Sequence, residues 1–393
     1  MSWRAAWVVA TKEVVDNVRD RRTLLASLLY PLLGPVLLVV LLGVTVNSMT
    51  ERAEKPLELP VVGAEHAESL IGFLEQHRVE IQPPPEDPEA AVRAGDLEVV
   101  LVVGSDFGEA FEAGRPAPLT LIFDESRTTA GVNIRRAQGL LDGYGRQIAN
   151  LRLLARGVDP QVIEPLQVVR RSVATAQGRG ASLLGMAPYF IIFAIFIGGM
   201  YLAIDTTAGE RERRSLEPLL INPVPRWQIV LGKYAATLVF TAVAVIETLA
   251  GFAVALNYLP LEDFLGARFA LGAGALGTIF LITVPMMLLA AALQLVIATF
   301  TRSFKEAQNY LSMLPLVPAL PGLFLVFLPV KAKLWMMMIP TFGQQLLIQQ
   351  LMRGEAIDLF HTAVSALMTL LAAAALLAVA MRLYRSERVI FGG

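Results

Sequence analysis

Long uncharged apolar runs dominate this chain and restrict it to few kinds of fold. A helix needs roughly 20 mostly apolar residues to cross the hydrocarbon core of a bilayer. Runs that meet this requirement cover residues 24–46, 181–204, 234–258, 269–301, 307–330 and 359–381. Charged residues make up only 17% of the chain, against about a quarter in soluble domains. The sequence therefore predicts an α-helical integral membrane protein with about six transmembrane helices.

Two of the apolar segments are irregular. The run at 307–330 contains four prolines, so we expect a local break there, which is tolerated where the backbone faces protein or a cavity. Residues 334–352 are also uncharged, but Gln344, Gln345 and Gln349 would share one broad side of a helix. Amide groups are costly against lipid. We therefore expect a re-entrant or interfacial segment at 334–352, with a seventh span as the alternative.

Residues 47–180 separate the first two runs and are predicted to form an α+β domain outside the cytoplasm. Short runs rich in β-branched residues predict strands, and amphipathic periodicity predicts helices. The predicted strands are residues 57–62, 99–103 and 119–123, and the predicted helices are residues 65–77, 88–94 and 128–156.

The N-terminal 22 residues have the pattern of an amphipathic helix. Trp3, Trp7, Val8, Val14, Val15 and Val18 recur at roughly helical spacing, with charged residues between them. Such a helix is expected to lie in the plane of the membrane surface.

Lysine and arginine gather at one set of membrane ends, which predicts the orientation. That side carries Arg4, Lys12, Arg19, Arg21, Arg22, Arg211, Arg213, Arg214, Arg226, Lys233, Arg302, Lys305, Arg382, Arg385 and Arg388. The short loops of the other side carry Arg268, Lys331, Lys333 and Arg353. Both termini are therefore predicted to be cytoplasmic, in what we expect to be the inner membrane of a bacterium.

These predictions divide the chain into consecutive parts. They are a cytoplasmic amphipathic helix (1–22), the first span (23–46), the external domain (47–180), the second span (181–208), a cytoplasmic loop (209–228), spans three to six (229–383) and a cytoplasmic tail (384–393).

The loop at 209–228 carries the clearest functional pattern. Glu210 and Arg214 are four residues apart, so a helix here would form its own ion pair. Leu216, Leu219 and Leu220 would lie on one apolar edge, which suits a groove on a soluble partner. The residues alone fit equally well a solvated loop that enforces topology.

This loop resembles a known sequence pattern. From Gly209 it reads G-E-R-E-R-R-S-L-E-P-L-L, similar to the G-E-R-E-R-G-T-L-E-x-L-L common in the cytoplasmic loop of type-2 ABC exporter permeases. Arg214-Ser215 replaces the usual Gly-Thr pair. Thr11-Lys12-Glu13 and Arg19-Asp20-Arg21-Arg22 also resemble the family's pattern before its first span. The large external domain is similar to that of the sodium-efflux permease subgroup.

The resemblance implies a half-transporter rather than an enzyme. Two permease copies, identical or closely related, would pair in the lipid bilayer, each contacting a separate ABC ATP-binding subunit through this loop. The residues expected to contact that subunit are Glu210, Arg211, Glu212, Arg213, Leu216, Glu217 and Leu220. ATP and Mg²⁺ would bind to the partner, and this chain would bind no cofactor. It has no G-x-x-x-x-G-K-[ST] phosphate loop, because Gly232-Lys233 lacks the earlier glycine and is followed by Tyr234.

Polar residues within the apolar runs are candidates for the translocation path, because such residues are costly in lipid. Glu247 interrupts the third span and is expected to bind a cation or line the exit path, or else to pair structurally with a neighbouring helix. Asp205 is expected to position the cytoplasmic loop. Gln294 and Asn309 are expected to form hydrogen bonds between helices.

Other classes of function fit less well. An ion-driven secondary transporter would require internal repeats and several intramembrane charges, and a membrane-anchored receptor would require a cytoplasmic output domain. The chain has no cysteine and three scattered histidines, so no metal site is expected, and its net charge of −1 does not suggest nucleic acid. The substrate is expected to be Na⁺ or a small or amphipathic molecule.

Overall fold

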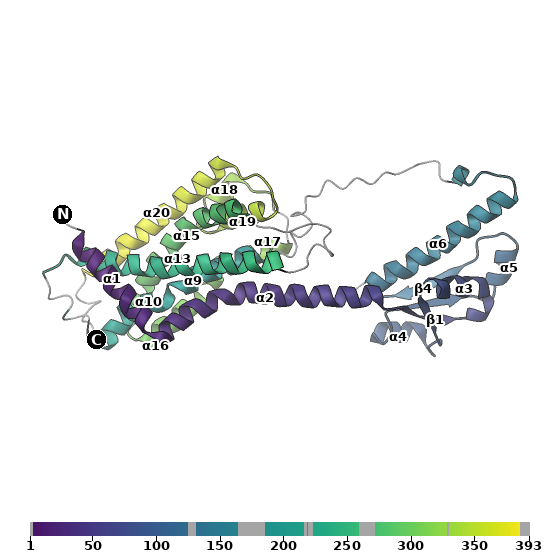
Figure 1. Ribbon diagram of the computed structural model, residues 1–393, viewed down its shortest axis with the longest axis horizontal. Helices are drawn as coiled ribbons and strands as arrows, with labels where there is room; N and C mark the ends of the chain where they lie inside the picture. Colours follow the sequence, from purple (N-terminus) through teal and green to yellow (C-terminus); the bar gives the residue numbers. More distant parts are fainter. Residues whose placement is uncertain are drawn as a thin grey trace. The chain divides into compact units, whose positions relative to one another are not determined.

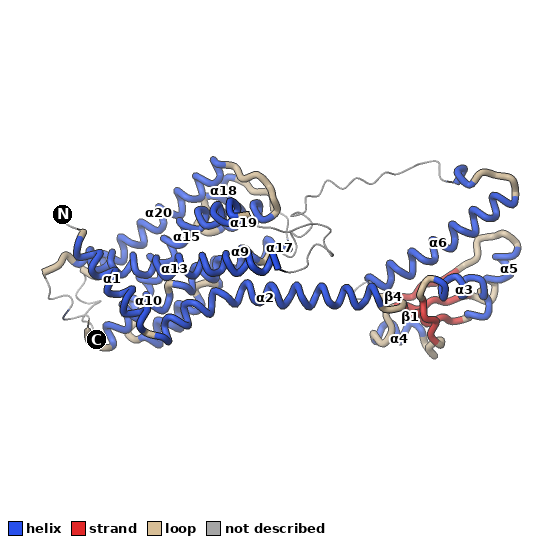
Figure 2. Tube along the Cα trace, in the orientation of Figure 1, coloured by secondary structure: helices blue, strands red, loops and turns tan. Residues whose placement is uncertain are grey.

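The computed structural model describes residues 3–124, 131–163, 185–215, 218, 223–258, 272–327 and 330–385. The chain divides into two compact units, which we call the helical unit (Met1–Val46 with Ser172–Gly393) and the sheet unit (Asn47–Arg171). Figure 2 shows the strands, in red, gathered in the sheet unit.

The helical unit contains a long series of helices (Figure 1). They are α1 (Arg4–Arg19), α2 (Arg21–Glu54, whose residues beyond Val46 belong to the sheet unit), α9 (Ala187–Gly198), α10 (Met200–Ile204), the π-helical turn η3 (Asp205–Gly209), α11 (Glu210–Glu212), α13 (Arg226–Tyr258), α15 (Ala273–Phe300), α16 (Phe304–Met313), α17 (Leu316–Phe327), α18 (Leu334–Met337), α19 (Phe342–Met352) and α20 (Leu359–Leu383).

Five helical stretches of the described residues are long and apolar enough to cross a membrane. They are Leu24–Leu41, Ala187–Glu212, Arg226–Asn257, Ala273–Phe300 and Leu359–Leu383. Two of them, Ala187–Glu212 and Ala273–Phe300, are 72% buried within the chain, so they form the centre of the unit. The other stretches present more of their apolar surface outward, as expected for helices whose solvent is lipid.

The predicted span at 307–330 is not one continuous helix. The structure has two helices there, α16 with 10 residues and α17 with 12, each shorter than the roughly 20 residues that a helix needs to cross a bilayer. The break falls at Leu314 and Pro315, because proline lacks the N–H that would continue the helical hydrogen bonds. The structure thus has the local break that the prolines predicted in this run.

The glutamine-rich segment is likewise two short helices, α18 and α19. Three of the four glutamines of α19, Gln344, Gln345 and Gln349, are buried in protein. Their Nε2 atoms donate to backbone carbonyls of neighbouring helices: Gln344 to Ser365 O at 3.1 Å, Gln345 to Pro318 O at 2.6 Å and Gln349 to Leu325 O at 3.0 Å. Leu325 O lies in the last turn of α17, where carbonyls have no helical partner. The amide face therefore packs on α17 and α20, which agrees with the expectation that it avoids lipid.

The sheet unit is a four-stranded sheet with helices. Its strands are β1 (Leu57–Val62), β2 (Val79–Gln82), β3 (Val99–Val103) and β4 (Leu119–Phe123), and its helical elements are η1 (Ala64–His66), α3 (Glu68–Gln76), α4 (Pro88–Ala94), α5 (Phe107–Glu112), α6 (Gly131–Ala155) and η2 (Pro160–Ile163). The order is β2-β1-β3-β4, with β1 parallel to β2 and β3, and β4 antiparallel to β3.

The core of the sheet unit joins the strands to α3 and α6. Leu59 and Leu101 of the strands pack with Leu70 of α3 and with Ala137 and Tyr144 of α6. Strands β1, β3 and β4 have the bounds predicted from the sequence, whereas β2 was not predicted. The predicted helix at 65–77 is divided into η1 and α3. The position of this unit outside the cytoplasm stays a prediction.

Candidate functional site

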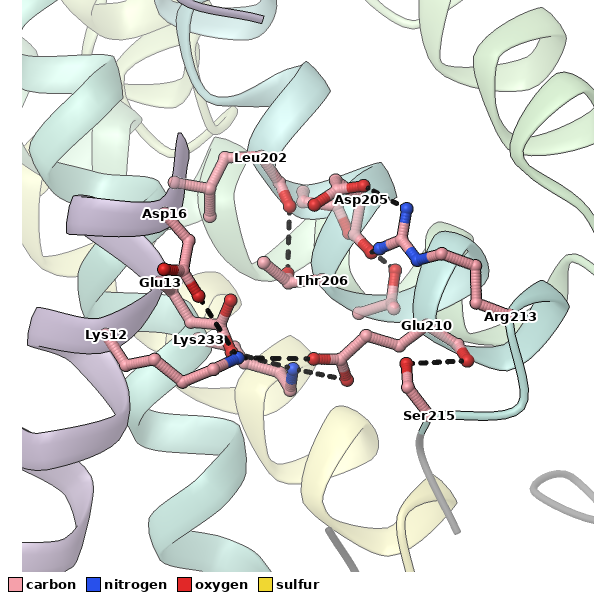
Figure 3. Close-up of polar contacts among 12 residues, drawn as sticks. Lys12, Glu13, Asp16, Leu202, Asp205, Thr206, Glu210, Arg213, Ser215 and Lys233 are labelled. Atoms are coloured by element: carbon pink, nitrogen blue, oxygen red, sulfur yellow. Dashed lines mark hydrogen bonds and ion pairs between the residues drawn. The ribbon is translucent and has the colours of Figure 1, made fainter. Parts of the chain in front are cut away.

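An ion-pair cluster is buried at one end of the helical unit, where α1, α11 and α13 meet. Its members are Glu13, Glu210 and Lys233, whose exposed fractions are 3%, 7% and 0%. The Lys233 Nζ atom lies 2.7 Å from Glu210 Oε2 and 3.4 Å from Glu13 Oε1. Figure 3 shows these side chains together with Lys12. A lysine as buried as this is stable in its charged form only when it is paired and hydrogen-bonded.

Lys12 completes the charge balance at the edge of this cluster. Its Nζ atom lies 3.2 Å from Glu13 Oε1, 3.6 Å from Asp16 Oδ2 and 4.0 Å from Glu210 Oε1. Unlike Lys233, the Lys12 side chain is 53% exposed. Two cations thus face the two buried carboxylates, one from inside the protein and one from its surface.

The sequence of α1 places Glu13 on the face that meets α13. The buried residues of α1 are Ala6, Ala10, Glu13 and Asn17, which recur at the spacing of one helical face. The opposite face exposes Trp3, Trp7, Val8, Val15 and Val18. Such an apolar face, on a helix that directly precedes a candidate span, fits a helix lying at the membrane surface.

Gly232 allows α1 and α13 to approach closely (Figure 1). A Cβ atom at this position would lie 2.6 Å from Val9 Cβ and 2.8 Å from Ala6 O, both too close for van der Waals contact. Because glycine lets α1 and α13 approach this closely, the side chain of the next residue, Lys233, reaches Glu13 on α1. The Gly-Lys pair thus has a packing and ion-pairing role in the fold.

The charged segment, which we define as Glu210–Ser215, begins as a continuation of a span and ends in a sharp turn. The π-helical turn η3 leads into α11, and the Ser215 N–H donates to Glu210 O at 2.9 Å. Arg214 adopts a left-handed conformation with φ of 55°, a region that favours glycine. The glycine that stands at this position in the permease pattern quoted above would adopt this turn without steric cost.

Two side chains of the charged segment bind the connection between α15 and α16. The Arg211 Nη1 atom donates to Thr301 O at 2.8 Å, and Glu212 Oε2 accepts from the Phe304 N–H at 2.7 Å. Phe304 is the first residue of α16, so the Glu212 carboxylate satisfies a free N–H at a helix N-terminus. The charged segment is therefore attached to a second pair of helices.

Asp205 and Arg213 form an ion pair along one side of η3 and α11. Their Oδ1 and Nη1 atoms are 2.9 Å apart, and this hydrogen bond raises the pKa of Arg213. Figure 3 shows the pair beside the turn that ends the segment. Asp205 is thus attached to the charged segment, and its role in positioning the cytoplasmic loop stays a prediction.

The C-terminal end of α20 reaches the same region. The Arg226 Nη1 atom, at the start of α13, donates to Tyr384 O at 3.2 Å. Burial raises the pKa of the Tyr384 phenol above its usual range, and the charge of the Glu210 carboxylate acts in the same direction. The neutral phenol thus adds no further negative charge near Glu210 and Glu13.

Several details predicted for the loop need correction. The expected helical ion pair between Glu210 and Arg214 is absent from the described residues, because α11 ends at Glu212 and Glu210 turns inward to Lys233. Leu216, Glu217 and Leu220 lie outside the described residues. Contact of this loop with an ATP-binding subunit stays a prediction.

Sequence reasoning missed Lys233 and Glu13 as site residues. Lys233 was counted among the loop charges, but it belongs to α13, which begins at Arg226. The partners Glu13 and Lys233 are 220 positions apart, so no local pattern connects them. One feature of the sequence could have identified Lys233 as a site residue. It lies within two turns of a predicted span, where an unpaired charge is costly.

The predicted intramembrane residues have different surroundings. Gln294 is fully buried and its Nε2 atom donates to Phe196 O at 2.6 Å, which confirms the expected hydrogen bond between helices. Asn309 is exposed on α16, and among the described residues its side chain has no hydrogen bond to another helix, so that expectation stays a prediction. The Glu247 Oε2 atom is buried without a hydrogen-bond partner in the described part of the chain.

An apolar cavity of about 460 Å³ opens at the surface of the helical unit. Residues of α9, α15, α17 and α18 contribute to its lining, including Phe196, Leu289, Pro318 and Trp335. Within the described residues, no group of three or more His, Cys, Asp or Glu side chains is arranged to hold a metal ion.

Comparisons with known proteins agree with this arrangement. The family model described as "ABC-2 family transporter protein" matches residues 26–382, which include the charged segment and most of the candidate spans. ABC transporter permease protein NatB of Bacillus subtilis (strain 168) is 28% identical over 354 residues, covering 87% of this chain and 88% of NatB. This chain therefore belongs to the ABC-2 family of transporter proteins and is a multi-pass membrane permease.

Proposed function

We propose that this chain is the transmembrane subunit of an ATP-driven exporter, joined to a separate ATP-binding subunit. The observation that carries this proposal is the connectivity of the charged segment. Glu210 pairs with Lys233 of α13, and Arg211 and Glu212 bind the connection between α15 and α16. Movement of this one segment would therefore move several spans together. A subunit that lies outside the membrane and hydrolyses ATP needs such a connection to change the conformation of the spans.

The ATP-binding subunit would dock on the surface that begins at the charged segment and continues through Leu216, Glu217 and Leu220. Most of the charges from Glu210 to Arg213 are satisfied within the chain, so we assign them a transmitting role. The leucines and Glu217 would supply the partner contact. ATP and Mg²⁺ would bind to the partner subunit.

We further propose a paired assembly in the inner membrane of a bacterium, with both termini in the cytoplasm. The predicted cytoplasmic ends carry most of the lysine and arginine outside the sheet unit, in keeping with the positive-inside rule. The partner across the membrane would be a second copy of this chain or a closely related permease. The sheet unit would then lie outside the cytoplasm.

The exported substrate is proposed to be Na⁺ or a small amphipathic molecule. Glu247 is a carboxylate within α13 whose Oε2 atom is buried without a hydrogen-bond partner among the described residues, which supports a cation on the path. The apolar cavity near Phe196 and Leu289 supports an amphipathic substrate.

Inside-out vesicles that contain the chain and its ATP-binding subunit test this proposal. We expect uptake of radioactive Na⁺ that requires ATP, survives a protonophore, and is lost when the phosphate-loop lysine of the partner is replaced. Substitution of Glu247 by Gln should reduce this uptake. Na⁺ uptake driven by an ion gradient without the partner would instead identify a secondary transporter. ATP hydrolysis stimulated by amphipathic compounds but not by Na⁺ would assign the amphipathic substrate.

A further inference from the structure

One wall of the apolar cavity is held by a side chain that is not itself part of the lining. Val317, Pro318 and Pro321 of α17 line the cavity. The Gln345 Nε2 atom, on α19, donates to Pro318 O at 2.6 Å. Gln345 is completely buried and is not one of the lining residues that the structure describes. It therefore acts on the cavity through a residue that lines it.

The prolines of α17 make this helix dependent on its neighbours. Pro318 and Pro321 have no N–H, so two carbonyls of the preceding turn lack their usual helical donor. Contacts with other helices must therefore fix the geometry of α17 at the cavity. The amide of Gln345 supplies one such contact, and Gln349, one turn later in α19, supplies a second by donating to Leu325 O at 3.0 Å.

The Gln345 amide fits closely against α17. Its Oε1 atom faces Gly322, where an added Cβ would come too close to this oxygen for van der Waals contact. The amide cannot turn away from position 322 without losing the hydrogen bond of its Nε2 atom to Pro318 O. Gly322 and Gln345 are therefore matched to each other across the contact between α17 and α19.

The backbone where α19 begins is held in a strained conformation. Thr341 lines the cavity and directly precedes α19. Its φ is 71°, in the left-handed region that a β-branched residue rarely adopts. Such strain persists only where the surrounding structure fixes it, and it is concentrated at functional sites. The shape of this end of the cavity is therefore maintained at an energetic cost, which fits a wall that matches a ligand.

We propose that Gln345 is a positioning residue for this cavity. By holding Pro318, it fixes the position of the α17 wall relative to Phe196 and Trp335 on the other walls. The occupant is the apolar end of an amphipathic molecule, because every lining side chain except Thr341 is apolar or aromatic. A cavity held in its binding shape binds more tightly, because less freedom is lost on binding. The inference rests on the amphipathic substrate of the proposed function.

The test uses Trp335 as a fluorescent reporter, because its side chain lines the cavity. The other tryptophans, Trp3, Trp7 and Trp227, are replaced by Phe in the full-length chain, which is studied in lipid nanodiscs without the ATP-binding subunit. The probe is ω-bromoundecyltrimethylammonium, an amphipathic cation whose terminal bromine quenches tryptophan fluorescence on contact. Saturable quenching gives the Kd of the cavity, whereas quenching by probe dissolved in lipid rises steadily with its concentration.

Gln345→Met removes the amide that holds α17 and keeps a side chain of similar length. The matched control is Gln344→Met, on the same helix. Gln344 is also buried, but its amide donates to Ser365 O and Thr369 Oγ1 of α20, a helix without a residue in the described lining. Both variants lose a buried hydrogen bond and should melt at similarly lowered temperatures. A purely structural role of Gln345 predicts equal Kd values for the two variants.

We expect Gln345→Met to raise the Kd for the probe about tenfold, the size expected for loss of one buried hydrogen bond, and Gln344→Met to leave it unchanged. Gly322→Ala, which displaces the same amide from the α17 side, should also raise the Kd. Gly277→Ala, on α15 with open space around the added methyl group, should not. In the complex with the ATP-binding subunit, Gln345→Met should raise the probe concentration that half-maximally stimulates ATP hydrolysis and leave the maximal rate unchanged.

The two measurements separate this inference from the proposed function. Saturable quenching that depends on Gln345, without any stimulation of ATP hydrolysis by the probe, would count against the exporter and leave the positioning role standing. If quenching of Trp335 in the chain with Gln345 does not saturate, the positioning role is wrong. It is also wrong if folded Gln345→Met and Gly322→Ala bind the probe as tightly as the chain without these substitutions.

Discussion

Lys233 is the residue on which the buried cluster depends. Its replacement by Met removes the cation that neutralises Glu13 and Glu210 inside the protein. Loss of one member of a buried ion pair costs roughly 3–5 kcal/mol, so we expect a large fall in the melting temperature of the detergent-solubilised chain. The triple variant Glu13→Gln, Glu210→Gln, Lys233→Met should recover most of this loss, because no buried charge remains uncompensated.

Lys12→Met is the matched control for this prediction. Lys12 contacts the same carboxylates, but its side chain is 53% exposed, and exposed ion pairs contribute at most about 1 kcal/mol. Its melting temperature should therefore remain close to that of the unsubstituted chain. Equal melting of the Lys12→Met and Lys233→Met variants would show that the cluster does not stabilise this end of the protein.

At Arg214 we expect a substitution that raises the melting temperature instead of lowering it. Its φ of 55° costs a non-glycine residue about 1–2 kcal/mol relative to right-handed backbone. Arg214→Gly should therefore raise the melting temperature above that of Arg214→Ala, which removes the side chain but keeps the Cβ atom. A melting temperature of Arg214→Gly below that of Arg214→Ala would contradict the turn described for the charged segment.

At the scale of elements, the contact between α1 and α13 depends on Gly232. In Gly232→Ala the new Cβ would clash with the α1 backbone at Ala6, so α1 should move away from α13. The chain has no cysteine, so a single cysteine at the buried position Ala10 reports this movement through its reaction with a maleimide. We expect slow labelling of Ala10→Cys alone and fast labelling when Gly232→Ala is added.

Two controls define this experiment. Gly277→Ala, on α15, introduces a methyl group with open space around it and should leave the labelling slow. Thr11→Cys is exposed and should react quickly in every background. Slow labelling of Ala10→Cys in the Gly232→Ala variant would show that α1 tolerates the added Cβ without separating from α13.

The helices and strands also show which structural features the sequence patterns predict and which they do not. Strands β1, β3 and β4 are rich in apolar residues and were predicted with their observed bounds, whereas β2 is four residues long with two polar ones and resembles a loop. The break before Leu316 followed from Pro315, but whether a proline ends a helix or only bends it depends on packing that a single sequence does not reveal.

At the scale of the whole molecule, the family and the membrane class were predictable and the site was only partly so. The apolar runs and the Glu210–Arg213 motif are local patterns, and the family comparison confirmed what they indicated. The burial of Glu210 on Lys233 was not predictable, because it depends on α1, α11 and α13 meeting at one place. The motif therefore appeared as a surface helix, whereas the structure makes it an attachment point for several spans.

We propose that an ATP-binding subunit acts on the spans through the loop that begins at the charged segment. The most direct test is co-purification of that subunit with the tagged permease carrying Glu217→Arg. The charge-reversal control is Glu355→Arg, which precedes α20 and lies at the end of that helix away from Tyr384 and the charged segment. We predict that Glu217→Arg loses the ATP-binding subunit and its associated ATPase activity, while Glu355→Arg retains both. A Glu217→Arg complex with unchanged subunit content and unchanged ATPase activity would show that this loop does not hold the ATP-binding subunit.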